Sequence, residues 1–273
     1  MSKKNKSQNI DPYDFIIETL SGGVVMKKDP RGYTGSPGRE VYAFLESDPP
    51  ADKLSTVASV VAAAIPSKPL SRAVHLSLFL RYLYGCMEKQ GTVRNSEQRK
   101  QWTTERKSWE RSDQFMSQVC GLLKKAGNRY GLCLCHEMMA HRRADTAAMT
   151  GNMSYLDEAI SLYDKAASEA EDVGAVKNTY STRFWAFRYL HMLTPKSPLC
   201  MKYAMMFFEA MDKNCKTSTA ECKMVPVLNA LMSITSRDEW DRLVYPRLSQ
   251  MKNKILRKFS YRKISGKYPI PFR

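Results

Sequence analysis

The sequence predicts an all-α protein, a multi-helix fold of two packed helical sub-domains followed by a basic, irregular C-terminal tail. Apolar residues recur at helical spacing along most of the 273 residues, and no sustained alternation typical of strands occurs. A helix-start signature, Ser three positions before Asp or Glu, occurs at Ser154, Ser218 and Ser236. Pro269 and Pro271 exclude a helix from the last few residues.

The chain is expected to divide near residue 150. Thr150-Gly151-Asn152 interrupts the helical pattern, and the charge changes from basic to acidic there. We therefore predict an N-terminal helical domain over residues 1–150, a C-terminal helical domain over residues 151–250 and a basic tail over residues 251–273.

The first 50 residues combine short helices with an irregular loop. One helix is expected over residues 11–20 and another over residues 40–46. Between them, residues 21–38 are rich in Gly and Pro and predict a loop.

Residues 54–83 predict two apolar helices joined by a proline turn. Leu54–Ile65 is nearly uncharged and consists mainly of Ala, Val, Ser and Thr, so we expect it to be buried on all faces. Pro66 should end it, because a residue before proline avoids the helical region. Pro69 suits the first turn of the second helix, Leu70–Leu83.

Helices are expected along the rest of the chain as well: over residues 96–125 with an interruption near 108–112, and over 128–147, 155–171, 176–193, 197–214, 218–234 and 236–248. Residues 155–167 resemble the second helix of a tetratricopeptide repeat. No second copy occurs about 34 residues away, and a solenoid needs several. We interpret the segment as an amphipathic helix with one buried face, formed by Leu156, Ala159, Ile160 and Tyr163.

The formal net charge of +16 predicts polyanionic partners, because such an excess attracts nucleic-acid phosphates, anionic lipid head groups or acidic proteins. The charge is uneven. Residues 94–143 hold eleven Lys or Arg against five acids, and residues 251–273 hold eight and no acid. Residues 151–175 hold six acids against one Lys, so basic and acidic segments of neighbouring copies could attract one another.

A basic cluster in the mid-chain helical region is the first candidate site for nucleic acid or lipid. Its members are Arg94, Arg99, Lys100, Arg106, Lys107 and Arg111. Trp102 and Trp109 lie between them, and guanidinium groups bind phosphate through paired hydrogen bonds. The alternative is a solvated helix in which Glu97, Glu105 and Glu110 pair with the same bases.

The tail is the second candidate site. Its uncompensated cations are Lys252, Lys254, Arg257, Lys258, Arg262, Lys263 and Lys267. Apolar and aromatic residues such as Phe259 and Tyr261 lie between them, a composition that suits an anionic membrane surface or single-stranded RNA. The alternative is a flexible, solubilising tail.

The search for chemistry is mostly negative, and we expect no enzyme and no catalytic residues. A weak zinc candidate consists of Cys133, Cys135, His136 and His141. On one helix these four do not share a face, so zinc would require the helix to break. The alternative is an ordinary helix with buried cysteines, and no cofactor is expected. Seven cysteines without regular spacing favour reduced thiols.

Residues 44–83 also carry a family resemblance. The matching features are Phe44-Leu45, Pro49, Leu54-Ser55, Ile65-Pro66-Ser67-Lys68, and Arg72 with Phe79 to Leu83. In this order and at this distance from the N-terminus, they resemble the N-terminal half of an orthomyxovirus matrix protein. The resemblance is distant: past Arg94 only the order of a basic helix and a small-residue helix is similar. The apolar helix lacks the family's aromatic residues and is about two residues shorter.

The resemblance implies a viral structural matrix protein that self-assembles under the envelope and bridges anionic lipid and ribonucleoprotein. It implies a peripheral contact with the inner leaflet of the membrane, not a spanning one. It places the protein in the virion interior, the host cytoplasm, the inner face of the membrane and the host nucleus. In that family the mid-domain basic helix serves RNA, membrane and nuclear import. Tyr245-Pro246-Arg247-Leu248 also resembles a short budding motif. The alternative function is a viral RNA-binding nucleocapsid or non-structural protein.

Overall fold

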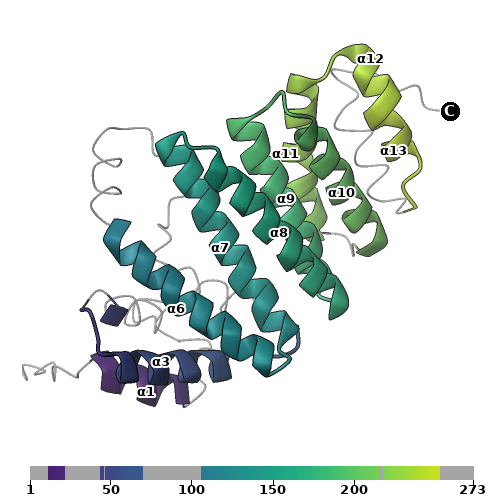
Figure 1. The fold of residues 1–273 in the computed structure, drawn as a ribbon. Helices are drawn as coiled ribbons and strands as arrows, with labels where there is room; N and C mark the ends of the chain where they lie inside the picture. The colour runs from purple at the N-terminus through teal and green to yellow at the C-terminus, as the bar shows by residue number, and fades with distance from the viewer. Residues whose placement is uncertain (1–11, 22–43, 46, 70–105, 215–217, 253–273) are drawn as a thin grey trace, which may run out of the picture. The chain divides into compact units, whose positions relative to one another are not determined.

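The computed structural model confirms the all-α prediction: every regular element among the described residues is a helix (Figure 1). The structure describes residues 12–21, 44–45, 47–69, 106–214 and 218–252. The chain forms two compact units, residues 1–142 and residues 143–273, which are taken in turn.

The N-terminal unit is built around α3 (Ala51–Ala64), which packs against α1 (Pro12–Ser21) and against α6 (Arg106–Lys125). The first half of α7 (Arg129–Thr150) completes it. Its core is apolar and includes Ile16, Leu20, Phe44, Leu45, Val57, Val61, Phe115, Val119 and Leu123. The predicted helix over 40–46 is described only at Phe44 and Leu45, which are helical and buried. The predicted loop 21–38 and the second apolar helix, 70–83, lie outside the described residues.

One prediction about α3 is wrong: the helix is buried on one face only. Val57, Ala58 and Val61 are buried, whereas Ser55, Thr56 and Ser59 are exposed. The Ser and Thr side chains tolerate this exposure because their hydroxyls bond to the helix backbone, as Ser59 Oγ donates to the Ser55 carbonyl at 2.9 Å. The predicted stop is confirmed, since Ile65 before Pro66 is extended with φ −80° and ψ 121°.

The predicted interruption near residues 108–112 is also wrong, because α6 runs without a break from Arg106 to Lys125. Polar residues there do not end the helix. Farther along α6, Phe115, Met116 and Val119 are buried while the polar residues between them face solvent, so the helix is amphipathic. The predicted helical residues 96–105 lie outside the described residues.

The C-terminal unit contains antiparallel helices (Figure 1). Helix α9 (Val176–Leu193) packs between α8 (Ser154–Asp172) and α10 (Pro198–Asn214), and it also contacts α11 (Ser218–Ile234). The largest fully buried side chains of the C-terminal unit are aromatic: Tyr163, Tyr203, Phe207, Phe208 and Trp240. The inward face predicted for α8 is confirmed at Leu156, Ala159 and Tyr163, whereas Ile160 is half-buried.

The described part of the unit ends in a helical segment with a π-helical turn. Helix α12 (Arg237–Glu239) leads into η3 (Trp240–Val244) and α13 (Tyr245–Ser249). The capping box predicted at Ser236 is confirmed, because Glu239 N–H donates to Ser236 Oγ at 3.2 Å and Ser236 N–H donates to Glu239 Oε2 at 2.8 Å. The capping role predicted for Ser154 is wrong. Ser154 is the first residue of α8, and its N–H and hydroxyl bond to Asn152.

Candidate polyanion-binding surfaces

The structure describes only part of the two predicted basic sites. Arg94, Arg99 and Lys100 lie outside the described residues. The same is true of six tail cations, namely Lys254, Arg257, Lys258, Arg262, Lys263 and Lys267. Arg106, Lys107 and Arg111 belong to the first two turns of α6, where the structure describes the backbone but not the side chains. Lys252 is exposed, and its backbone N–H donates to Asp212 Oδ2 at 3.0 Å.

The exposed side of α6 forms a continuous polar stripe, which we call the α6 stripe. It consists of Gln114, Ser117, Gln118, Gly121, Lys124 and Lys125. These positions recur every three or four residues, as one helix face requires. Positions 106 and 107 fall on the same line of the helix, 18 residues or about 27 Å before Lys124 and Lys125. The backbone of α6 therefore places cationic positions at both ends of one face.

The turn between α6 and α7 is bonded to the proline turn after α3. Asn128 is buried and forms the N-cap of α7, because its Oδ1 accepts the N–H of Gly131 at 2.8 Å. Its Nδ2 donates to the Ile65 carbonyl at 3.0 Å, which brings the proline turn after α3 to this corner. Lys68 and Arg129, near these two anchors in sequence, are both exposed.

The sequence analysis did not single out Lys68, Lys124, Lys125 or Arg129 as site residues. Two adjacent lysines before Ala126-Gly127 are typical of an ordinary helix end, because cations are favourable near the carbonyl end of the helix dipole. The signal that they belong to a shared surface is the contact between Asn128 and Ile65, which are 63 positions apart. No local pattern encodes that contact.

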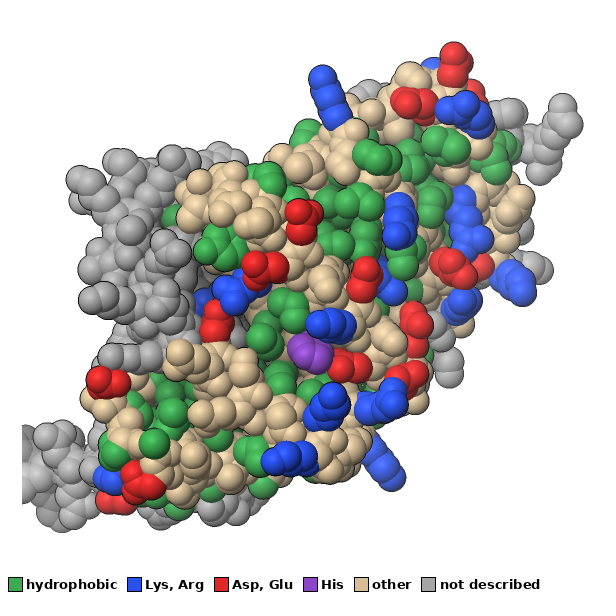
Figure 2. Space-filling view, viewed as in Figure 1, with side chains coloured by type: hydrophobic (Ala, Val, Ile, Leu, Met, Phe, Trp, Pro, Cys, Tyr) green, Lys and Arg blue, Asp and Glu red, His purple; other side chains and the backbone are tan. Residues whose placement is uncertain are grey.

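The described part of the C-terminal unit is nearly neutral. Residues 143–214 and 218–252 contain 13 Lys or Arg and 13 Asp or Glu, whereas residues 253–273 contain seven Lys or Arg and no acid. Figure 2 shows blue and red side chains intermixed over the upper right of the view, where α10 to α13 lie in Figure 1. Ion pairs occur in this region, such as Lys213 with Glu209 at 2.9 Å, and also elsewhere in the unit, such as Arg143 with Glu158 at 2.9 Å.

A partly buried polar cluster joins α8, α9 and α10. Arg183 forms an ion pair with Asp164, and the hydroxyl of Tyr203 donates to Asp164 Oδ2 at 2.7 Å. Burial raises the pKa of Tyr203, and the hydrogen bond to Asp164 and its negative charge raise it further. The hydroxyl therefore remains a donor at neutral pH, and the cluster fixes three helices relative to one another.

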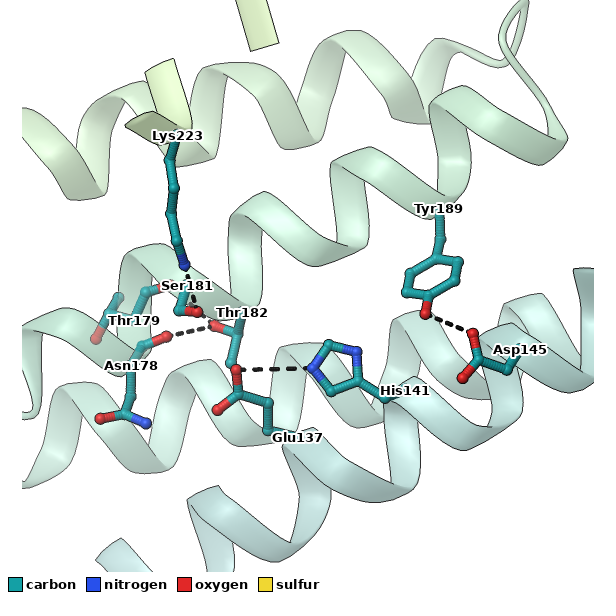
Figure 3. A network of polar contacts seen from close by, with 9 residues as sticks. All are labelled: Glu137, His141, Asp145, Asn178, Thr179, Ser181, Thr182, Tyr189 and Lys223. Carbon is teal, nitrogen blue, oxygen red and sulfur yellow. Dashed lines mark hydrogen bonds and ion pairs between the residues drawn. The ribbon is translucent and has the colours of Figure 1, made fainter. Parts of the chain in front are cut away.

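Two further polar contacts connect neighbouring helices of the C-terminal unit (Figure 3). The hydroxyl of Tyr189 donates to Asp145 Oδ1 at 2.6 Å. Lys223 Nζ donates to Ser181 Oγ at 2.7 Å and lies 5.1 Å from the ring centroid of Phe184. These contacts join α9 to α7 and to α11.

The weak zinc candidate is not assembled. Helix α7 is unbroken from Arg129 to Thr150, and its Cys133 and Cys135 are buried, two positions apart. His141 Nε2 lies 4.0 Å from Glu137 Oε1, one turn away on the same helix (Figure 3). Within the described ranges, no three His, Cys, Asp or Glu side chains converge as metal ligands would. The described helices also include none that is long and apolar enough to cross a bilayer.

Comparison with known proteins adds no relative: no family model, curated protein or solved structure matches this chain.

Proposed function

We propose that this chain is a viral matrix-type protein that assembles beneath an envelope and bridges anionic lipid and ribonucleoprotein through basic surfaces. The observation that carries the proposal is the distribution of charge. A nearly neutral helical segment, residues 143–252, separates two basic regions. Residues 1–142 hold 22 Lys or Arg against 14 acids, and residues 253–273 hold seven against none. Two separate cationic regions suit a protein that contacts two polyanions at once.

The resemblance of residues 44–83 to orthomyxovirus matrix proteins supports the same proposal. Of the features that carry it, the end of α3 before Pro66 is as predicted, whereas α3 is buried on one face only. The basic tail supports peripheral membrane contact, because each Lys or Arg near an anionic surface contributes about 1 kcal/mol.

Self-association is the third part of the proposal, and the structure changes which acids are available for it. Within α8, Glu158 pairs with Arg143, and Asp164 is held by Arg183 and Tyr203. Asp157 and Glu171 are exposed, and neither forms an ion pair with a described residue. We therefore assign attraction between copies to these two exposed acids of α8.

The budding motif does not contribute to the proposal. Tyr245-Pro246-Arg247-Leu248 lies in α13 and its flank, and Leu248 is fully buried. A short linear motif is read in an accessible segment, so this one is closed to a partner in the folded chain.

Flotation with vesicles tests the proposal. The purified chain should float with phosphatidylserine vesicles in the absence of RNA, sediment with phosphatidylcholine vesicles alone, and scatter more light at low salt as it assembles. Failure to float with anionic vesicles at low salt would refute the membrane part. A monomer by light scattering at every salt concentration, with anionic vesicles present, would refute the assembly part.

The alternative is an RNA-binding nucleocapsid or non-structural protein. The α6 stripe favours it, because its exposed side chains are polar or cationic and the apolar face of α6 is buried. A nucleocapsid protein should protect RNA from nuclease at a regular spacing and should not float with vesicles. These two readouts separate the two functions.

A further inference from the structure

Gly121 is the unusual residue of the α6 stripe. It lies in the interior of a 20-residue helix, where Gly is less favourable than Ala because it restricts the unfolded chain least. Glycines in helices often admit a neighbouring segment. A Cβ added at Gly121, however, would meet no atom of the described residues within 4 Å, so packing within the described part of the chain does not require this glycine.

The contrast with Gly131 on α7 makes the point sharper. A Cβ at Gly131 would lie 2.9 Å from Ile65 Cγ2 and 2.9 Å from Leu123 Cδ2, so packing within the chain explains that glycine. Gly121 instead leaves a flat, accessible stretch of helix backbone between Gln118 and the two lysines at 124 and 125. Close approach by a partner's backbone is a use of glycine that this position fits.

The chemistry of the stripe selects the partner. Its side chains are amide, hydroxyl and ammonium groups, which are the groups that contact phosphate and sugar in nucleic-acid complexes. Nucleic-acid interfaces are polar and positively charged. Interfaces between protein copies are depleted in Lys and Ser. Helices that lie on a bilayer present apolar side chains to it, and the apolar face of α6 is buried.

We infer that the α6 stripe seats the sugar–phosphate backbone of RNA, which passes close to Gly121 and places phosphates at Lys124 and Lys125. Neither lysine forms an ion pair with a described residue, so both are available for phosphate. The amides of Gln114 and Gln118 extend the track along the helix. The inference rests on the RNA binding that the proposed function includes, and it names the surface that performs it.

The first arm of the test removes charge. In the full-length chain, the Lys124→Gln/Lys125→Gln double variant is compared with Lys165→Gln/Lys177→Gln, which removes two exposed lysines from α8 and α9. Binding to a single-stranded homopolymeric RNA is measured by fluorescence anisotropy over a range of salt concentrations. The α6 variant should bind about tenfold more weakly at low salt, and its salt slope should fall by about 1.4. The matched control should change both quantities less.

The second arm fills the space without changing charge. Gly121→Gln adds the side chain already present at positions 114 and 118, and Ser168→Gln makes the same addition at an exposed position of α8. Gly121→Gln should raise the thermal midpoint by about 2–4 °C, because Gln forms helix better than Gly. It should nevertheless weaken RNA binding by about five- to tenfold, whereas Ser168→Gln should leave RNA binding unchanged.

The outcomes separate this inference from the proposed function. If the unmodified chain binds no RNA at low salt, RNA binding itself is refuted and this inference falls with it. If the unmodified chain binds RNA and Gly121→Gln binds equally well, only the inference is refuted. It is also refuted if the two lysine double variants weaken binding equally, since net charge then explains the effect. Loss of vesicle flotation or of light scattering by Gly121→Gln, with RNA affinity intact, would assign the stripe to a bilayer or to another copy and overturn the inference.

Discussion

The side-chain amide of Asn128 donates a hydrogen bond of 3.0 Å to the carbonyl of Ile65, across 63 positions of sequence. The same side chain accepts the N–H of Gly131 at 2.8 Å and so caps α7. One buried residue therefore links the end of α3 to the start of α7. It also fixes the turn that follows Lys124 and Lys125, the last residues of the α6 stripe.

Replacing Asn128 should destabilise the N-terminal unit. Asn128→Ala removes the cap and leaves the buried Ile65 carbonyl without this donor, so we expect a loss of about 2–3 kcal/mol in the free energy of unfolding. Asn128→Asp keeps an acceptor for Gly131 but cannot donate to Ile65, and it should also be destabilising. Asn229→Ala on the exposed side of α11 is the control and should change stability by less than about 0.5 kcal/mol. Urea unfolding measures the stability of all three variants. Equal stability of Asn128→Ala and Asn229→Ala would contradict the role of Asn128 in linking α3 to α7.

The two glycines of α6 and α7 should respond to Ala in opposite directions. Gly131→Ala places a methyl group 2.9 Å from Ile65 Cγ2 and 3.0 Å from Asn128 Cγ, and this overpacking should cost about 1–3 kcal/mol. Gly121→Ala meets nothing and should stabilise by about 0.5–1 kcal/mol through helix propensity. Thermal unfolding of the two variants, followed by circular dichroism, checks the signs. A shift in the same direction for both would mean that the packing described around Gly131 is wrong.

The buried and exposed faces of α3 allow a matched pair of substitutions to be compared. Val61 is fully buried, so Val61→Asp forces an unpaired carboxylate into the core and should cost about 4 kcal/mol or more. Ser59→Asp makes the same addition on the exposed face and should cost less than about 1 kcal/mol. Soluble yield and urea midpoints measure the difference. A well-folded Val61→Asp protein would show that this face of α3 is not part of the core.

Local signals predicted the described helices well where those signals are strong. Helix α9 has the predicted bounds, Val176 to Leu193, because its aromatic residues and the following Pro195 mark it clearly. The capping box at Ser236 also formed as predicted. The exposed side of α3 was not predicted, because composition gives the size and charge of side chains but not which face meets another helix.

The candidate site was less predictable than the fold. Lysines at the end of a helix have the same local pattern whether they cap a dipole or border a binding surface. Long-range contacts, such as the bond between Asn128 and Ile65, bring the proline turn to the turn between α6 and α7. The pairing of Arg143 with Glu158 likewise could not be read from a count of acids along α8.

The last prediction concerns Tyr203, whose hydroxyl donates to Asp164 Oδ2 at 2.7 Å. Its pKa is raised in the folded protein, first by burial and then by Asp164. Below the unfolded value of about 10, the neutral hydroxyl stabilises the fold. Above it, the unfolded chain releases a proton that the folded chain retains, so this contribution to stability falls as pH rises.

Tyr203→Phe isolates that effect because it removes the hydroxyl and keeps the buried ring. At pH 7 the variant should be about 1 kcal/mol less stable than the unmodified chain. Between pH 10 and 11 the unmodified chain should lose up to about 1.4 kcal/mol that the variant does not lose, so the difference should shrink or change sign. Urea unfolding of the two proteins from pH 7 to 11 measures this. If the difference in the free energy of unfolding between Tyr203→Phe and the unmodified chain stays constant through pH 11, the Tyr203 hydroxyl titrates as it does in the unfolded chain.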